Sequence, residues 1–328
     1  MIKRNKRENK KGKILVTGAT GFVGANLVRR LVAQDYDVSI LTRRTSNKWR
    51  IKNILPEVND YCVDLLDLPK LKKVVKKIKP KAIFHLATSG IYAGYHLPDR
   101  DLVEHNFFGT LNLIESCENI DYSCFVNTGS SSEYGPKLFA MKESDICQPV
   151  NTYGVTKLAA TRYCSCVAMS QDKPILTLRL FSPYGPYDDV SRLMFYAVYH
   201  ALRDEDLLLG DPASVRDYCY IDDVTSLYLK CIPGAHCYKG EVFNAGSGRQ
   251  TRIGDIVKSI VRLSGSKSRL CWKSQESRPF EKNVKIWKAD ISKTKECLSW
   301  QPKYTIEEGL IKTISWFRKN RDLLKGLL

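Results

Sequence analysis

The sequence contains no long apolar segment and no paired cysteine motif. No window approaches the ~20 apolar residues that a membrane-spanning helix needs, and no apolar segment with a cleavage site follows the basic start MIKRNKRENKKGK. The eleven cysteines form no CxxC pair and have no companion histidine cluster, so we expect no metal site. We therefore expect a cytoplasmic protein with reduced cysteines and no membrane partner.

Acidic residues are few relative to basic ones, since 35 Asp and Glu stand against 52 Lys and Arg, for a net charge of +17. Residues 3–13 hold seven basic residues and one glutamate, which predicts a disordered basic tail over 1–12. The remaining charge forms either a solvated surface or a field that attracts anions such as phosphorylated small molecules. Nucleic acid is another candidate for such a field, but we expect no specific nucleic-acid partner.

Short apolar runs alternate with longer amphipathic stretches from Lys13 to about Leu180. The runs KILVTG, DVSILT, KAIFHLA, CFVNTG and ILTLRLF are mostly too uniformly apolar to alternate, as in strands buried on both faces. Stretches between them, such as FVGANLVRRLVAQ and LPKLKKVVKKIK, carry apolar residues at helical spacing. The repeated order predicts an α/β fold with a Rossmann-type, doubly wound parallel sheet, formed by a dinucleotide-binding domain over 13–180.

The pattern changes after LFSPYGPYDD, where turns rich in proline and glycine separate shorter helices and isolated strands. We expect residues 181–328 to form mainly a smaller α/β substrate-binding domain. Some of its segments are expected to return to the first domain.

Three glycines follow the first predicted strand in LVTGATGFVG. Gly18 would permit a tight turn, Gly21 would let the backbone approach a pyrophosphate, and Gly24 would let the helix pack closely on the strand. The start of that helix, at Phe22 and Val23, offers unpaired N–H groups and a partial positive charge to phosphates. This motif at the first strand–helix junction therefore predicts a dinucleotide site.

The end of the second predicted strand bears on which dinucleotide binds. It reads ILTRRTS, which places Arg43 and Arg44 where an NAD-binding protein would carry an acidic residue against the ribose. Two guanidinium groups can bind a 2′-phosphate, and no carboxylate is present to repel it. The pattern favours NADP(H), with NAD(H) possible. Alternatively, both arginines are solvated loop charges.

The stretch NTYGVTKLAA places Tyr153 and Lys157 four residues apart near the start of a predicted helix, and hence on one face. An ammonium group near a phenol favours the phenolate, so the tyrosine can exchange a proton at working pH. Upstream, NTGSSSEYG follows a strand that should end at the same carboxyl edge of the sheet as the glycine loop. We therefore expect a serine hydroxyl within reach of Tyr153.

In sum, these motifs resemble those of the extended short-chain dehydrogenases/reductases, in the nucleotide-sugar epimerase/dehydratase/reductase group. The resemblance covers almost all of residues 13–320 and rests on TGATGFVG, VDLLD, FHLA, HNFFGT, SSSEYG, YGVTK, LRLFSPYGP, SVRDYCYIDDV, FNAGSG and KADISKTKECLSWQPKYTIEEGL, in that order. It implies an enzyme with a nicotinamide cofactor and a nucleoside-diphosphate sugar as substrate. It also implies a homodimer, in which the helix of DLVEHNFFGTLNLIESCE and the helix after Tyr153 pair with their symmetry mates.

The resemblance also implies roles for individual residues. Tyr153 matches the family's general acid/base, Lys157 matches its partner that also binds the nicotinamide ribose, and Ser130 matches the residue that hydrogen-bonds the reacting sugar oxygen. The further matches are Asp64 and Leu65 at the adenine, Ala87 beside the cofactor, Ser131 and Ser182 at the substrate, and Arg216 and Arg278 at the sugar nucleotide's diphosphate.

Two departures from the family pattern bear on the activity. Family dehydratases carry an Asp-Glu pair directly after the catalytic Ser/Thr, whereas this chain has Ser131 and Ser132, so sugar 4,6-dehydration is not expected. Many epimerases carry an asparagine where this chain has Ser182, which loosens the resemblance to them without excluding it. Glu133 lies one position too late for the dehydratase acid and is assigned no role.

Three functions are compatible with the sequence. The leading hypothesis is an NADPH-dependent reductase of a nucleotide-linked 4-keto sugar, such as a 4-keto-6-deoxyhexose, with Tyr153 as proton donor and Ser130 orienting the carbonyl. The alternative is a nucleotide-sugar 4-epimerase that retains NAD(P). A third function, of another class, is non-catalytic sensing of a dinucleotide or binding of polyanions. Only the basic charge supports it, and the intact Ser, Tyr and Lys set is evidence against it.

Overall fold

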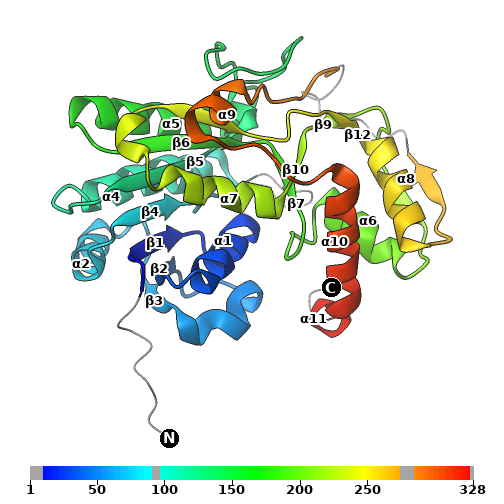
Figure 1. Cartoon of the computed structure of the whole chain (residues 1–328), viewed down its shortest axis with the longest axis horizontal. Coiled ribbons are helices and arrows are strands. Elements are labelled where there is room, and N and C mark those ends of the chain that lie inside the picture. The colour runs from blue at the N-terminus through cyan, green and yellow to red at the C-terminus, as the bar shows by residue number, and fades with distance from the viewer. Residues whose placement is uncertain (1–9, 91–96, 274–283, 326–328) are drawn as a thin grey trace, which may run out of the picture.

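A seven-stranded parallel sheet lies at the centre of the structure, a computed structural model that describes residues 10–90, 97–273 and 284–325 (Figure 1). The spatial order of the strands is β3-β2-β1-β4-β5-β6-β11, and every neighbouring pair is parallel. The strands are β1 (Lys13–Thr17), β2 (Asp37–Thr42), β3 (Asn59–Cys62), β4 (Ala82–His85), β5 (Cys124–Ser130), β6 (Ile175–Leu180) and β11 (Val242–Ala245). The order reverses between β1 and β4, which confirms the predicted doubly wound sheet.

Helices cover both faces of the sheet, because alternate strand residues point to opposite sides. Ile14 and Val16 pack with α1 (Phe22–Ala33) and α7 (Ile221–Cys231). Leu15, between them, belongs to a second core. That core packs against α2 (Leu68–Ile78), α4 (Gly109–Ser116) and α5 (Thr152–Ser170). The strands are therefore buried on both faces, as their uniformly apolar sequences predict.

The smaller C-terminal unit lies beside the sheet and is built on three packed helices (Figure 1). The rings of Phe195 on α6 and Phe317 on α10 pack edge to face with their centres 4.9 Å apart, and α8 packs on both helices. The helices are α6 (Leu193–Ala201), α8 (Ile253–Ser264) and α10 (Ile306–Lys319), followed by the short α11 (Arg321–Lys325). The strand pairs are β7 (Ser182–Tyr184) with β10 (Tyr218–Tyr220), β9 (Val215–Arg216) with β12 (Thr251–Arg252), and β8 (Leu207–Leu209) with β13 (Leu270–Trp272).

Several elements from the C-terminal half belong to the sheet layer rather than to the smaller unit. The strand β11 lies beside β6, and α7 packs on α1 and β5. The short elements α9 (Ser292–Leu298) and η4 (Ala235–Cys237) pack on β11 and on β5 and β6, respectively. The remaining short elements are η1 (Trp49–Glu57) and η3 (Ser131–Glu133).

One predicted helix is continuous in the structure but contains a wide turn. The stretch DLVEHNFFGTLNLIESCE forms α3 (Asp99–Val103), a π-helical turn η2 (Glu104–Phe108), and α4. Within the wide turn, Asn106 is buried and its side chain donates to the carbonyl of Ser89 at 2.9 Å and to Thr156 Oγ1 at 3.0 Å. The Asn106 amide in this wide turn therefore links the loop after β4 to α5. Such π-helical turns occur frequently at functional sites.

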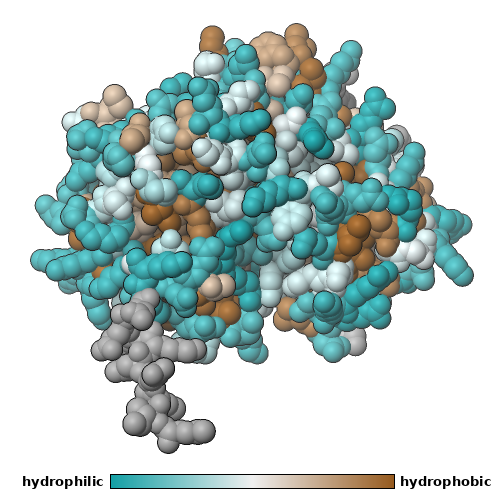
Figure 2. Space-filling view, in the orientation of Figure 1, coloured by the Kyte–Doolittle hydropathy of each residue, from teal (hydrophilic) through white to brown (hydrophobic). Residues whose placement is uncertain are grey.

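The predicted basic tail, 1–12, falls outside the described residues except for residues 10–12. There the Lys11 N–H donates to the carbonyl of Asp35 at 3.0 Å, so the residue is held against the turn that precedes β2. Hydrophilic side chains predominate on the face of the molecule shown in Figure 2. No helix in the described ranges is long and apolar enough to cross a bilayer.

Candidate active site

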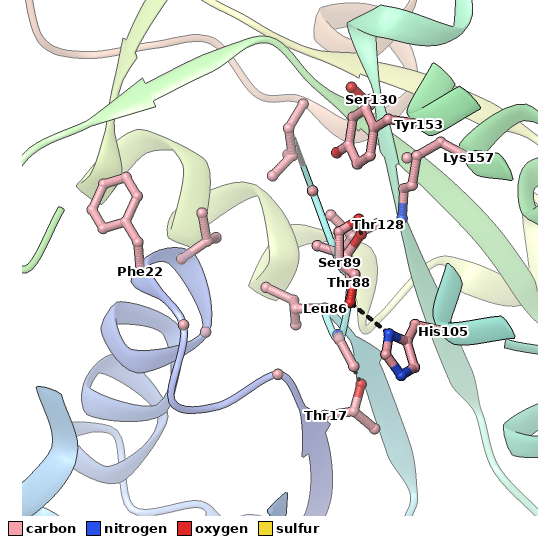
Figure 3. A pocket seen from close by; sticks show the side chains of 18 of the residues that line it. Thr17, Phe22, Leu86, Thr88, Ser89, His105, Thr128, Ser130, Tyr153 and Lys157 are labelled. Carbon is pink, nitrogen blue, oxygen red and sulfur yellow. Dashed lines mark hydrogen bonds between the residues drawn. The ribbon is translucent and has the colours of Figure 1, made fainter. Parts of the chain in front are cut away.

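A cavity of about 550 Å³ lies at the carboxyl edge of the sheet (Figure 3). Its lining comes from the loops after β1, β2, β3 and β4, from the end of β5 and from the start of α5, and it continues into the segment after β6 and the strand β9. In open α/β sheets this edge, next to the point where the strand order reverses, is where ligands bind.

The glycine loop after β1 forms one wall of the cavity. Gly18 has φ +66°, and a Cβ there would lie 2.5 Å from the backbone nitrogen of Ala87, while a Cβ at Gly24 would collide with the carbonyl of Gly18. Gly21, Phe22 and Val23 follow at the start of α1, which no side chain caps. The first N–H groups of α1 therefore remain available to an anion. This backbone cradle fits the pyrophosphate of a dinucleotide.

The end of β2 brings one of the two predicted arginines to the cavity. Arg43 lines the rim, and its backbone N–H donates to Ser46 Oγ, a second lining residue, at 2.9 Å. Arg44 is exposed and is not among the lining residues; it lies within a turn in which the Ser46 N–H donates to the carbonyl of Arg43 at 3.0 Å. Asp64 and Leu65, after β3, also line the cavity. The predicted adenine end thus has Arg43 but not Arg44.

A buried histidine that the sequence analysis passed over holds the loop after β4. The Thr110 hydroxyl donates to the carbonyl of Asn106 at 2.7 Å, so it accepts from His85 Nε2 at 2.9 Å, and His85 Nδ1 then accepts from Thr17 Oγ1 at 2.7 Å. Burial, aided by the charge of Lys157, lowers the pKa of His85 to about 3, so the ring is neutral. Thr17 Oγ1 in turn accepts from the Ala87 N–H at 3.1 Å, which fixes Ala87 against the cavity.

The start of α5 presents Tyr153 and Lys157 to the cavity. The Asn151 side chain caps the helix by accepting the Gly154 N–H at 2.8 Å, and both functional side chains point from the helix into the pocket (Figure 3). Lys157 is buried, and burial lowers its pKa, while the charge of Glu133 opposes that shift. Tyr153, one turn earlier on the same helix, is half-buried.

The end of β5 brings the serines to the same place. A Cβ on Gly154 would lie 2.6 Å from the carbonyl of Ser132, so the glycine allows α5 to approach the serine turn closely. Ser130 and Ser131 are buried and line the cavity. Figure 3 shows Ser130 beside Tyr153. Ser130, Tyr153 and Lys157, predicted from motifs 23 residues or more apart, therefore share one pocket.

The opposite side of the cavity carries the candidate substrate residues. Ser182 and Arg216 line it, and the Arg216 guanidinium lies 5.6 Å from the centre of the Trp287 ring. Trp287 also donates from Nε1 to Ser131 Oγ at 3.2 Å. The sequence analysis did not single out Trp287, because the motif KADIS begins only after it. Arg278, predicted to bind the diphosphate, lies outside the described residues.

No group of three or more His, Cys, Asp or Glu side chains in the described ranges could hold a metal ion.

This combination of a doubly wound sheet, a glycine cradle and a Ser, Tyr, Lys set defines an extended short-chain dehydrogenase/reductase enzyme. Residues 14–246 match the NAD dependent epimerase/dehydratase family, and the chain belongs to that family. Proteins that resemble this chain include a UDP-glucuronate 4-epimerase, a dTDP-glucose 4,6-dehydratase, and a UDP-glucuronic acid 4-epimerase whose structure contains NAD.

Three relatives illustrate the match. A UDP-glucuronate 4-epimerase of Thermodesulfobacterium geofontis is 28% identical, over 96% of this chain and 99% of its own length. The structure of a UDP-glucose 4-epimerase of Thermotoga maritima with UDP-glucose superposes with a TM-score of 0.86 at 29% identity, over 94% of this chain and 99% of that one. The structure of a UDP-glucuronic acid 4-epimerase of Bacillus cereus, in complex with UDP-glucuronic acid and NAD, superposes with a TM-score of 0.83 at 28% identity. It covers 94% of this chain and 99% of that one.

Proposed function

We propose that the protein is a nucleotide-sugar 4-epimerase that retains NAD(H) through its catalytic cycle. The observation that carries this proposal is a cavity in which Ser131 and Ser132, rather than an acidic pair, follow Ser130 beside Tyr153 and Lys157. The three relatives above are 4-epimerases, and the match covers nearly the whole length of each. This similarity supports the epimerase alternative over the reductase hypothesis.

In this reaction the sugar's C4 hydroxyl is oxidised to a carbonyl, which is then reduced on its other face. The bound nicotinamide supplies the acceptor and donor of the hydride. Tyr153 takes the proton of the C4 hydroxyl and returns it to the same oxygen, while Lys157 stabilises the phenolate. Ser130 hydrogen-bonds that oxygen, and Arg216 binds the diphosphate at the far side of the cavity. The most direct test is conversion of UDP-glucose or UDP-glucuronate into its C4 epimer without added cofactor.

A second candidate is the NADPH-dependent reductase of a nucleotide-linked 4-keto sugar, which the same three residues would serve. The observation that favours it is Arg43 at the cavity rim, since a guanidinium there can bind a 2′-phosphate. A reductase must exchange its cofactor in every turnover, whereas an epimerase does not.

The contribution of Arg43 can be measured with a matched control. We expect Arg43→Asp to weaken NADPH binding about 10- to 100-fold and to change NADH binding much less, because charge-assisted hydrogen bonds contribute about 1.5–3 kcal/mol. Arg44→Asp makes the same charge change outside the cavity and should alter neither affinity by more than about twofold. Titration of protein fluorescence with each cofactor gives the affinities. Equal losses for NADPH and NADH in Arg43→Asp would contradict a contact with the 2′-phosphate.

We propose that the enzyme is a homodimer that pairs α4 and α5 with their symmetry mates. Phe108 and Val155, on η2 and α5, are 46% and 51% exposed although both are large and apolar. The rings of Phe107 on η2 and Tyr163 on α5 pack edge to face with their centres 6.0 Å apart, so the two helical segments form one face. Burying such a face in an isologous contact removes its apolar surface from water.

Light scattering tests the dimer. We expect twice the chain mass at micromolar concentration, and the single-chain mass for Phe108→Glu/Val155→Glu, because four carboxylates would be buried in the symmetric contact. The exposed Leu208→Glu, on β8, serves as the control and should leave the mass unchanged. A wild-type protein with the single-chain mass would contradict the proposal.

We also propose a cytoplasmic location. The eleven cysteines are free thiols, several of them buried, which matches a reducing compartment.

A further inference from the structure

A buried carboxylate lies directly beneath the candidate catalytic serine. Glu133, the last residue of η3, is 0% exposed, and its Oε1 accepts the backbone N–H of Ser130 at 2.7 Å. In the same turn Ser130 Oγ accepts the Ser132 N–H at 3.1 Å, which completes a capping box. A hydroxyl has one proton and two lone pairs, so this bond leaves the Ser130 proton and one lone pair for the cavity.

The second oxygen of the carboxylate is held by an equally buried arginine. Arg179 of β6 is 2% exposed, and its Nε donates to Glu133 Oε2 at 2.7 Å. Its guanidinium lies 4.5 Å from the centre of the Tyr134 ring, and the Tyr134 hydroxyl donates to Asn244 Oδ1 at 2.7 Å. Residues of β6, of the turn after β5 and of β11 therefore fix the position of the ion pair.

Fold stability alone gives no reason for such a pair. Taking two charges out of water costs several kcal/mol per ion, and buried ion pairs can often be replaced by apolar side chains without loss of stability. The cost is greater here because Arg179 Nη1 has no hydrogen-bond partner among the described residues. What the pair does provide is a rigid acceptor for the Ser130 amide.

The close fit around the carboxylate leaves little freedom to Ser130. A Cβ on Gly129 would lie 2.5 Å from Glu133 Oε1, so the carboxylate packs directly on the backbone that precedes the serine. The same negative charge opposes the effect of burial on the pKa of Lys157.

We propose that Glu133, held in place by Arg179, is a positioning residue that fixes the hydroxyl of Ser130 for its contact with the substrate. This proposal rests on the proposed function, in which Ser130 hydrogen-bonds the reacting oxygen. Glu133 acts on the substrate contact through Ser130, and it is not among the residues that line the cavity.

Two variants that both remove the buried charges isolate this role. In Glu133→Gln/Arg179→Met an amide oxygen can still accept the Ser130 N–H, whereas in Glu133→Met/Arg179→Met no acceptor remains. Both replace the ion pair by uncharged side chains of similar length, so neither leaves a single buried charge without a partner. The two variants differ at position 133 alone, in whether that side chain offers an acceptor to the Ser130 N–H.

The measurements are kcat and KM for UDP-glucose and UDP-glucuronate in the presence of NAD⁺, with the thermal unfolding temperature of each variant. We expect kcat of Glu133→Met/Arg179→Met to be about 10- to 100-fold below that of Glu133→Gln/Arg179→Met, because a misplacement of about 1 Å can cost 100-fold in rate. KM should agree within about twofold. In a Ser130→Ala background the two pairs of substitutions should give the same kcat, since the group they position is gone.

The outcomes separate this proposal from the proposed function. Equal kcat in the two variants, with Ser130→Ala strongly impaired, overturns the positioning role and leaves the function standing. Full kcat in Ser130→Ala overturns the function, and the positioning role with it. A measurement on the wild-type protein does not depend on how the variants fold: the amide proton of Ser130, bonded to a carboxylate, should resonate at unusually low field and exchange slowly with solvent. An ordinary, rapidly exchanging resonance would overturn the proposal.

Discussion

Tyr153→Phe is expected to lower kcat by about 100- to 10,000-fold, the range that a positioned proton donor or acceptor contributes. The substitution removes one hydroxyl from a half-buried side chain at the cavity, so the unfolding temperature and the cofactor affinity should change little. Steady-state rates with a UDP-hexose substrate and titration with NADH measure the two effects.

A tyrosine on the same helix provides the control for this result. Tyr163 lies on α5 but is not among the residues that line the cavity, and its ring packs on Phe107. Tyr163→Phe should therefore keep the wild-type kcat. If Tyr153→Phe also kept it, the proton would have to move through another group and the assigned chemistry would be wrong.

Lys157→Met should reduce both the rate and the cofactor affinity, because the lysine is expected to stabilise the Tyr153 phenolate and to bind the nicotinamide ribose. We expect a loss of at least 100-fold in kcat and of about 10-fold or more in NADH affinity. We expect the lower activity of Lys157→Met without a lower unfolding temperature. Lys157 is buried and burial lowers its pKa, so folding pays to bury the charge and an apolar side chain avoids that cost.

Calorimetry and cofactor titration on the same preparation check this prediction. An unfolding temperature well below that of the wild type would show that the charge of Lys157 stabilises the fold. Unchanged NADH affinity would remove the ribose contact while leaving the effect on Tyr153 in place.

Much of the fold could be predicted from sequence because its signals are local. The uniformly apolar strands and the GxxGxxG loop each read directly as part of a doubly wound sheet, and TYGVTKLAATRYCSCVAMS forms the single helix α5. Tyr153 and Lys157 are four residues apart on that helix, so their common face follows from helix geometry alone.

The parts of the site that were missed depend on contacts between distant segments. Glu133 reads as a surface residue in a polar turn, and its burial becomes evident only when Arg179, 46 residues later, lies on the neighbouring strand. His85 likewise meets Thr17 across 68 residues of sequence. Arg43 and Arg44 are equivalent in the sequence, and only the direction of the backbone after β2 distinguishes them.

The most direct measurement concerns the cofactor that the purified enzyme carries and what the enzyme does with it. The protein is purified without added nucleotide, denatured, and the released cofactor is identified and counted by chromatography. The intact enzyme is then incubated with UDP-glucose or UDP-glucuronate alone, and the products are separated. For a 4-epimerase that retains its cofactor, we expect close to one NAD(H) per chain and formation of the C4 epimer without any added cofactor. An enzyme that purifies empty, leaves both sugars unchanged, and oxidises added NADPH only with a 4-keto-sugar nucleotide would contradict it and establish the reductase instead.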